Sequence, residues 1–297
     1  MVHNPVLLKE VIEYLDPKPG DNIIDATLDG GGHSAAILEK IEPNGKILGI
    51  EIDPELVSAA KLKIKNEKLK NLIIVNDSYI NIEKIVREHN FRPNGILFDL
   101  GLSSWHYERS GRGFSFKKED EPLDMRYNPS TTAGRAAAEI VNTESREELE
   151  RIFEEYGEEQ FAESIAKNII SARKMKLIMT VGDLVEVIKY SVPDWYKKRK
   201  IHFATKTFQA LRIAANEELK NVSDGVSSAV NVLIPGGRLA VISFHGLEDK
   251  IIRELFKRKA KEGIVKFVIK GTVKPSWEEI KINPRARSAK LKIIEKI

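Results

Sequence analysis

The chain contains no cysteine, which excludes disulfide bonds, thiolate metal sites and cysteine nucleophiles. It also lacks any apolar run long enough to cross a bilayer, and its first residues have neither the basic stretch nor the apolar run of a secretory signal. His33, His202 and His245 do not have a metal-binding spacing such as H-E-x-x-H, so we expect no obligatory metal ion. These absences favour a cytoplasmic protein without a membrane partner.

A strong net charge is also absent, since the whole chain carries only +4 at neutral pH. The distribution is nevertheless uneven: residues 250–297 hold fifteen Lys or Arg against five Asp or Glu, which leaves the remainder net acidic by six. A basic segment fits a polyanionic partner, because each phosphate that it neutralises releases counterions. It fits a solvated Lys-rich surface equally well, so charge alone leaves both interpretations open.

Short β-rich runs alternate with helix-forming segments over the first third of the chain. The expected strands are residues 22–26, 46–50, 72–75 and 95–99, and the expected helices between them are residues 34–42, 54–65 and 80–89. Strands that are apolar throughout and separated by helices predict a mostly parallel sheet covered on both faces. The pattern returns late in the chain, with a fifth strand at residues 238–243 and a closing pair at residues 265–269 and 290–294.

The middle of the chain breaks this rhythm and has a helical pattern. Ser145-Arg146-Glu147-Glu148 has the form of a helix-capping box, residues 180–183 repeat it, and residues 162–171 offer a helix between the two. We therefore predict an α/β fold with an inserted all-helical domain at residues 107–206. Residues 1–106 and 207–297 together form the main domain in this prediction.

The sharpest local signal is a glycine-rich loop, Asp25-Ala26-Thr27-Leu28-Asp29-Gly30-Gly31-Gly32-His33-Ser34. It follows the first expected strand and precedes a helix, which is where open α/β sheets bind ligands. The glycines let a ligand approach the backbone, and the start of the helix favours an anionic group. A tight turn without a ligand has the same composition, so the loop alone is weak evidence for a site.

Acidic or aromatic residues also end the next three expected strands, in Glu51-Ile52-Asp53, in Asn76-Asp77-Ser78-Tyr79 and at Asp99. A carboxylate after the second strand can bind both hydroxyls of an adenosine ribose, whether in NAD or in S-adenosylmethionine. The loop is not the G-x-G-x-x-G fingerprint of dinucleotide-binding proteins, which favours the methyl donor. An NAD-linked oxidoreductase remains the main alternative enzyme, and a non-catalytic RNA-binding assembly factor is the alternative that needs no chemistry.

These residues belong to a longer series of ordered motifs, and through it nearly the whole chain resembles the ribosomal RNA small-subunit methyltransferase H family, also called MraW. The motifs are His3-Asn4-Pro5-Val6-Leu7-Leu8, Gly30-Gly31-Gly32-His33-Ser34, Asp99-Leu100-Gly101-Leu102-Ser103-Ser104, Arg112-Gly113-Phe114-Ser115-Phe116, Pro122-Leu123-Asp124-Met125-Arg126, the run from His202 to Ile213, Ile242-Ser243-Phe244-His245 and Asn283-Pro284-Arg285-Ala286-Arg287-Ser288.

The resemblance implies a class I methyltransferase, with a Rossmann-like, mostly parallel sheet and a helical insertion. It further implies methylation of the exocyclic N4 of a cytidine in the decoding region of small-subunit (16S) ribosomal RNA. The implied cofactor is S-adenosyl-L-methionine and the implied partner is the small ribosomal subunit or its RNA. Whether the protein is a monomer or a homodimer stays open.

Carried over position by position, the resemblance implies a set of cofactor-binding residues: Gly31, Gly32, His33, Glu51, Tyr79, Asp99 and His106. Three positions depart from the family's usual residues. Glu51 stands where the ribose-binding residue is usually aspartate, His106 where a glutamine is common, and Asp29 where a glycine is usual.

A cytosine N4 amine is a poor nucleophile because its lone pair is delocalised into the ring, so the enzyme must help it to lose a proton. Asp99 and Ser103 are the candidates for this catalytic role, and binding of the cofactor alone is the alternative role for Asp99. RNA recognition needs cationic and aromatic side chains. The candidates for it are Arg112, Phe114, Arg126, Lys206, Arg212, His245, Arg285 and Arg287.

Overall fold

The computed structural model describes residues 5–67, 71–130 and 134–297, and its chain divides into two units. Met1–Leu102 and Leu219–Ile297 form the sheet unit, and Ser103–Glu218 form the helical unit. The expected insertion, residues 107–206, ends within the first turn of helix α11 (Thr205–Ala215), which lies in the helical unit. This helix packs on α7 (Arg146–Gly157), where the Gln209 side-chain amide donates a hydrogen bond of 3.1 Å to the Tyr156 carbonyl.

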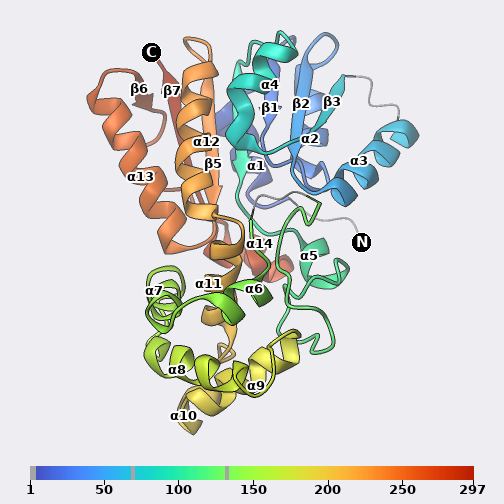
Figure 1. Cartoon of the computed structure of the whole chain (residues 1–297). Helices are drawn as coiled ribbons and strands as arrows, with labels where there is room; N and C mark the ends of the chain where they lie inside the picture. Colours follow the sequence, from blue (N-terminus) through green and yellow to red (C-terminus); the bar gives the residue numbers. More distant parts are fainter. Residues whose placement is uncertain (1–4, 68–70, 131–133) are drawn as a thin grey trace. The chain divides into compact units, whose positions relative to one another are not determined.

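The sheet unit has seven strands among its described residues, in the order β3-β2-β1-β4-β5-β7-β6 (Figure 1). The five expected strands from the first to the fifth run parallel, whereas β7 is antiparallel to both β5 and β6. The predicted mostly parallel sheet and its closing pair are therefore confirmed. The strands are β1 (Asn22–Asp25), β2 (Lys46–Glu51), β3 (Leu72–Asn76), β4 (Gly95–Asp99), β5 (Arg238–Ser243), β6 (Val265–Phe267) and β7 (Lys290–Lys296).

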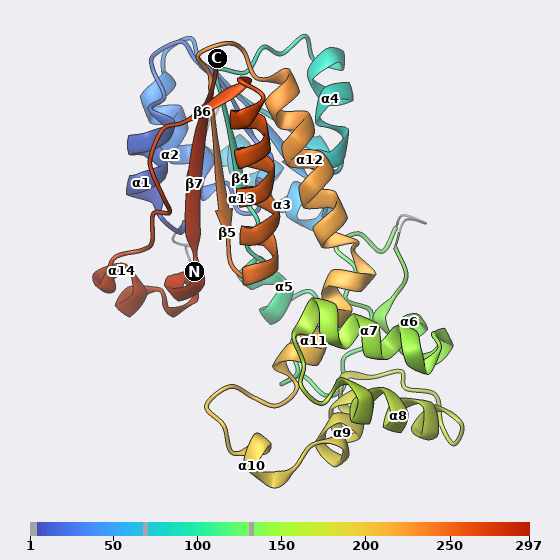
Figure 2. The same ribbon diagram turned by 90° about the vertical axis from the view of Figure 1, so that its left-hand side faces the viewer.

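Helices cover both faces of this sheet, and the three expected early helices are confirmed as α2, α3 and α4. Figure 2 shows α1 and α2 on one face and α4, α12 and α13 on the other. The helical segments of the unit are α1 (Leu8–Leu15), α2 (Gly32–Ile41), α3 (Pro54–Glu67), η1 (Tyr79–Asn81), α4 (Ile82–Glu88), α12 (Glu218–Val232), α13 (Gly246–Lys261), α14 (Trp277–Ile282) and η2 (Pro284–Ser288).

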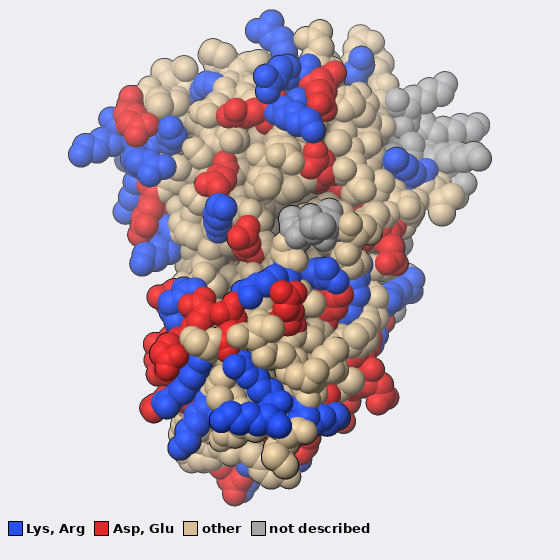
Figure 3. All heavy atoms as spheres, viewed as in Figure 1, with Lys and Arg blue, Asp and Glu red and all other residues tan. Residues whose placement is uncertain are grey.

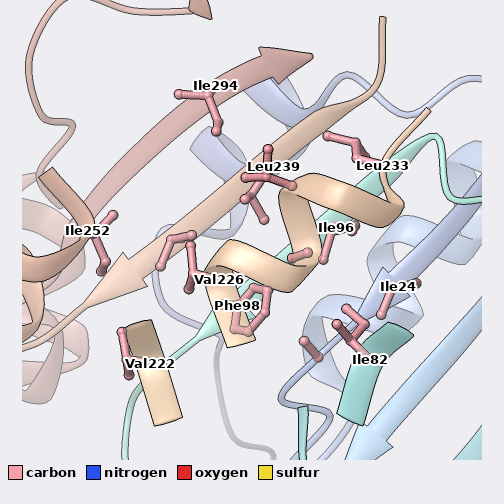
Figure 4. Packing of buried hydrophobic residues seen from close by; sticks show 14 of the residues in the cluster. Ile24, Ile82, Ile96, Phe98, Val222, Val226, Leu233, Leu239, Ile252 and Ile294 are labelled. Carbon is pink, nitrogen blue, oxygen red and sulfur yellow. The ribbon is translucent and has the colours of Figure 1, made fainter. Parts of the chain in front are cut away.

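Two apolar cores result, because successive side chains of each strand point to opposite faces. In β4, Ile96 and Phe98 enter the core beneath α12 and α13, whereas Leu97 enters the core beneath α1 and α2. Figure 4 shows Phe98 beside Val226 of α12. With both faces buried, the central strands β1, β2, β4 and β5 are apolar between their ends, whereas two of the three residues of β6 are exposed.

The helical unit is built from α5 (Ser104–Glu108), α6 (Ala137–Thr143), α7, α8 (Ala162–Arg173), α9 (Val181–Ser191), α10 (Asp194–Lys197) and α11. Both expected caps are present: the Ser145 hydroxyl accepts the Glu148 N–H at 3.1 Å, and Thr180 and Asp183 form a reciprocal capping box. α7 buries Leu149 against its neighbours. None of the helices that the structure describes, in either unit, is long and apolar enough to cross a membrane.

The segment between α5 and α6 departs from the all-helical prediction, because the described residues at 109–130 and 134–136 form no helix. Gly111, Gly113 and Met125 adopt positive φ values of 66°, 76° and 60°, which no helix accommodates. The Arg112 guanidinium holds this irregular segment together by donating to the carbonyls of Arg126 (3.0 Å) and Tyr127 (2.6 Å). Side-chain bonds to the backbone thus replace a regular hydrogen-bond ladder here.

We expect Phe98→Ala to lower the free energy of unfolding by about 3–5 kcal/mol, because the ring is fully buried and its removal leaves a cavity. Urea unfolding followed by circular dichroism measures this change. The matched control is Leu62→Ala in α3, whose side chain is 65% exposed and whose truncation should cost less than about 0.5 kcal/mol. Similar losses in the two variants would contradict the assignment of this core.

Candidate functional site

Three carboxylates meet at the carboxyl edge of the sheet. In the parallel register, Asp25 of β1 pairs with Gly49 of β2 and with Leu97 of β4. Glu51 and Asp99 each lie two residues beyond those partners, at the ends of their strands. The structure therefore brings two of the predicted site residues, Glu51 and Asp99, to one edge, where α/β sheets of this kind bind ligands.

The glycine-rich loop continues β1 into this edge and is held by backbone bonds. The N–H of Leu28 donates to the Ile50 carbonyl at 2.9 Å. The Leu28 side chain packs on Gly49, where an added Cβ would lie only 2.8 Å from the Leu28 Cδ1 atom. Gly31 has φ +69° and immediately precedes α2, while a Cβ on Gly30 would meet nothing within 4 Å. The loop therefore leaves open space beside its backbone at the start of a helix, which suits an anionic group of a ligand.

Glu51 ties this loop to the second strand. Its two carboxylate oxygens accept the backbone N–H groups of Asp29 and Asp53, each at 2.9 Å. Burial raises the pKa of Glu51 to about 8, and the two backbone N–H donors oppose that rise. Asp29 itself has φ +44°, a left-handed conformation that glycine and aspartate both adopt. The departure from glycine at position 29 is therefore compatible with the loop.

Asp99 faces His33, the residue that follows the glycines. The Nε2 of His33 lies 3.0 Å from the Val6 carbonyl and must carry a hydrogen, because a carbonyl oxygen only accepts. Its Nδ1 then faces the Asp99 Oδ2 at 3.6 Å. Burial raises the pKa of Asp99, and the positive charge of protonated His33 opposes that rise. The imidazole nitrogen and the carboxylate oxygen are therefore close neighbours but lie beyond hydrogen-bond distance.

Asp25 and Thr27 are not among the predicted site residues, although both lie in the glycine-rich loop motif. Asp25 is buried and accepts the Ser34 hydroxyl at 2.6 Å, and burial raises its pKa. The hydroxyl oxygen of Thr27 accepts the backbone N–H of Asp99 at 2.6 Å. These two residues join the loop to α2 and to β4, so they fix where Asp99 lies. In the sequence, only their position at the carboxyl end of the first strand indicated a role in the site.

Tyr79, the predicted aromatic contact, begins η1 after β3 and packs on the core. Its ring meets Phe98 edge-on with 5.3 Å between ring centroids, and a Cβ on Gly225 of α12 would collide with it. The core thus fixes the position of this ring at the same edge of the sheet. Its contact with a cofactor stays a prediction.

Ser103 and His106 lie in the helical unit. The Ser103 hydroxyl accepts the Trp105 N–H at 3.2 Å and so caps α5. The His106 ring is buried, with its centroid 5.0 Å from that of Phe114 and 5.3 Å from that of Tyr127. Both residues thus make structural contacts, and the catalytic role of Ser103 and the cofactor contact of His106 stay predictions.

Most of the predicted RNA-binding residues are engaged inside their own unit. Arg112 and Phe114 are buried, the first bound to backbone carbonyls and the second stacked on Tyr127 at 5.8 Å between centroids. Four more have polar partners: Arg126 with Asp124, Lys206 with the Glu158 carbonyl, Arg212 with Glu218 and His245 with Glu248. Of these eight residues, which all lie in the described part of the chain, only Arg285 and Arg287 are exposed.

Known proteins resemble this chain over its full length. The model of the MraW methylase family matches residues 1–297, although His3 and Asn4 of the first motif lie outside the described residues. Three curated relatives are each named ribosomal RNA small subunit methyltransferase H. They come from Dictyoglomus thermophilum (45% identity, 99% of this chain and 97% of the relative), Thermosipho melanesiensis (43%, 99% and 98%) and Dictyoglomus turgidum (41%, 100% and 98%).

The raised pKa of Glu51 predicts a pH dependence of stability. Between its ordinary value of 4.5 and about 8, the folded chain keeps a proton on Glu51 that the unfolded chain has lost. The stabilisation from this group is therefore complete below pH 4.5 and is lost as the pH rises through about 8. We expect the free energy of unfolding to fall over this range, and to fall less steeply in Glu51→Gln. Urea unfolding at a series of pH values measures both slopes, and equal slopes would contradict the prediction.

Proposed function

The chain belongs to the MraW methylase family, and from this premise we propose that it transfers a methyl group from S-adenosylmethionine to the N4 of a cytidine in the decoding region of small-subunit ribosomal RNA. The observation that carries the proposal is the edge at which the glycine-rich loop, Glu51 and Asp99 meet, in a chain 45% identical to a small-subunit methyltransferase. Family membership favours methyl transfer over the NAD-linked alternative. We propose that the enzyme acts in the cytoplasm, where this substrate is assembled.

The residues at the sheet edge fit this cofactor by their chemistry. The backbone at Gly31 and Gly32, at the start of α2, suits a carboxylate group. In the ionised form of Glu51, each oxygen accepts one backbone N–H and retains a second lone pair for a ribose hydroxyl. Tyr79 offers an aromatic surface for an adenine ring. When bound, S-adenosylmethionine supplies an electrophilic methyl group, and the chain's own task is to position and deprotonate the amine.

Asp99 is the proposed proton acceptor for the cytidine amine. Its carboxyl group ends β4, and its backbone N–H is fixed by the Thr27 hydroxyl. His33, held by the Val6 carbonyl, acts through Asp99 and is a positioning residue, because it balances the carboxylate charge when it is protonated. Ser103 is the second candidate, since its hydroxyl oxygen uses one lone pair to cap α5 and retains a second that can accept a hydrogen from the amine.

The proposed partner is the small ribosomal subunit or an assembly intermediate of it. The test is transfer of tritiated methyl groups from S-adenosylmethionine to small subunits, to protein-free 16S RNA and to free cytidine, with mass spectrometry of the nucleosides. We expect labelled N4-methylcytidine from the subunit or its RNA and none from free cytidine. Equal labelling of protein or DNA would refute the proposed substrate.

Asp99→Asn separates the catalytic role of this residue from cofactor binding, because it removes the basic carboxylate and keeps the shape. We expect kcat to fall by about 100-fold or more even at saturating S-adenosylmethionine. The matched control, Asp224→Asn, changes an exposed aspartate of α12 and should leave the rate unchanged. If saturating cofactor restores the rate of Asp99→Asn, then Asp99 only holds the cofactor.

A further inference from the structure

Trp277 exposes most of its side chain on a helix that no other part of the described chain covers at that point. It is 70% exposed and begins α14, where the Ser276 hydroxyl caps the helix by accepting the Glu279 N–H at 3.1 Å. The ammonium of Lys281 lies 5.6 Å from the centre of the indole ring, as a cation placed on an aromatic face. The indole surface is therefore presented to solvent with a positive charge beside it.

Further cations lie on either side of this ring in the sequence. Residues 270–288 hold five Lys or Arg against two Asp or Glu, whereas Lys290 and Lys292 of β7 pair with Asp249. Arg285 and Arg287 of η2 are exposed, and they are the two predicted RNA-binding residues that the fold leaves on the surface. One of the two acids, Glu279, faces the N-terminal segment, where its carboxylate accepts the Leu7 N–H at 2.7 Å. Within α14 and η2, Lys281, Arg285 and Arg287 stand against Glu278 and Glu279, so this surface carries a small excess of positive charge and an exposed indole.

The same surface lies at the edge of the sheet that holds the cofactor loop. η2 leads into β7, whose Lys290 pairs with Ser243 at the carboxyl end of β5. Figure 2 shows α14 beside the start of β7. The chain also links the two sites directly: Glu279 holds Leu7, and the neighbouring Val6 carbonyl accepts the hydrogen bond from His33.

Leu7 adopts φ +54°, a left-handed conformation that leucine rarely takes. It is fully buried, and its N–H bond to Glu279 compensates for part of the strain. The N-terminal segment is thus fixed between α14 on one side and His33 on the other. A ligand on α14 would therefore be held at a defined position relative to the cofactor loop.

We propose that α14 and η2 form a platform for single-stranded RNA, in which the Trp277 ring stacks on an unpaired base and Lys281, Arg285 and Arg287 contact the adjoining phosphates. An exposed aromatic ring among cations is the arrangement that binds unpaired bases, whose faces are free to stack. A duplex offers no such face along its length. On the face shown in Figure 3, basic and acidic side chains occur over both units.

The inference rests on the proposed function only for the choice of RNA as the polyanion. The test uses the full chain without cofactor and measures fluorescence anisotropy of a labelled single-stranded RNA of about twenty nucleotides and of its duplex. We expect Trp277→Ala to weaken single-strand binding about ten-fold and Trp277→Phe to retain most of the affinity. Lys281→Ala and Arg287→Ala should each lower the slope of log K against log salt by about 0.7.

The matched control is Ile282→Ala, which truncates an apolar side chain that is 74% exposed on the same helix and has no face for stacking. The affinity of this variant for RNA should lie within about two-fold of that of the unchanged protein. RNA binding by Trp277→Ala equal to that of the unchanged protein would overturn the platform. So would Trp277-dependent binding to phosphatidylglycerol vesicles with unchanged RNA affinity, since the surface would then recognise a membrane.

Methyl transfer by the unchanged protein separates this inference from the proposed function. If small subunits are methylated while Trp277→Ala binds RNA normally, the platform is wrong and the proposed function stands. If Trp277→Ala weakens RNA binding while no RNA is methylated by the unchanged protein, the proposed function is wrong and the platform stands.

Discussion

The carboxylate of Glu51 is the contact on which the rest of the site depends. It accepts N–H groups from both sides, one from Asp29 in the glycine-rich loop and one from Asp53 after its own strand. Without this group the loop would lose its fixed position over the sheet edge, and two buried N–H groups would lose their acceptor. The cost is a buried carboxyl group whose pKa is raised to about 8. A ribose that donates to the same oxygens would add stabilisation to a group that is already in place.

His33 connects that loop to the remaining parts of the sheet unit. Through its Nδ1 it faces Asp99, and through its Nε2 it holds the Val6 carbonyl. Leu7, the next residue, is held in turn by Glu279 of α14. One short N-terminal segment therefore contacts both the cofactor loop and the helix that carries the exposed indole. This arrangement gives the first motif of the family a physical role: it positions surfaces that lie far apart in the sequence.

The sequence predicted the regular strands and helices well, and it predicted poorly the side-chain contacts between residues that lie far apart in the chain. The central strands are apolar between their ends because both faces of the sheet are buried, and the limits of all seven strands agree with the prediction to within two residues. The glycine-rich loop was equally visible, because strand, turn and helix follow one another in the chain. Side-chain partners were not visible: nothing local indicates that Arg112 would bind the carbonyls of Arg126 and Tyr127. The loop of Gly111 and Gly113 lies inside the predicted helical insertion, and the tertiary bonds that shape it cannot be anticipated from the local sequence.

The basic residues show the same limit of sequence-based prediction, because the sequence does not reveal which of them are buried in ion pairs and which are exposed. Arg212 was a candidate for RNA, but in the fold its guanidinium pairs with Glu218 at 2.9 Å and both side chains are largely buried. Removing such a cation leaves a buried carboxylate unpaired, so its loss would damage folding before it changed RNA affinity. Arg287 of η2 is exposed, and so is the Trp277 indole of α14. Substitution of an exposed side chain leaves the packed interior intact, so α14 and η2 are better candidates for RNA recognition than the interior arginines.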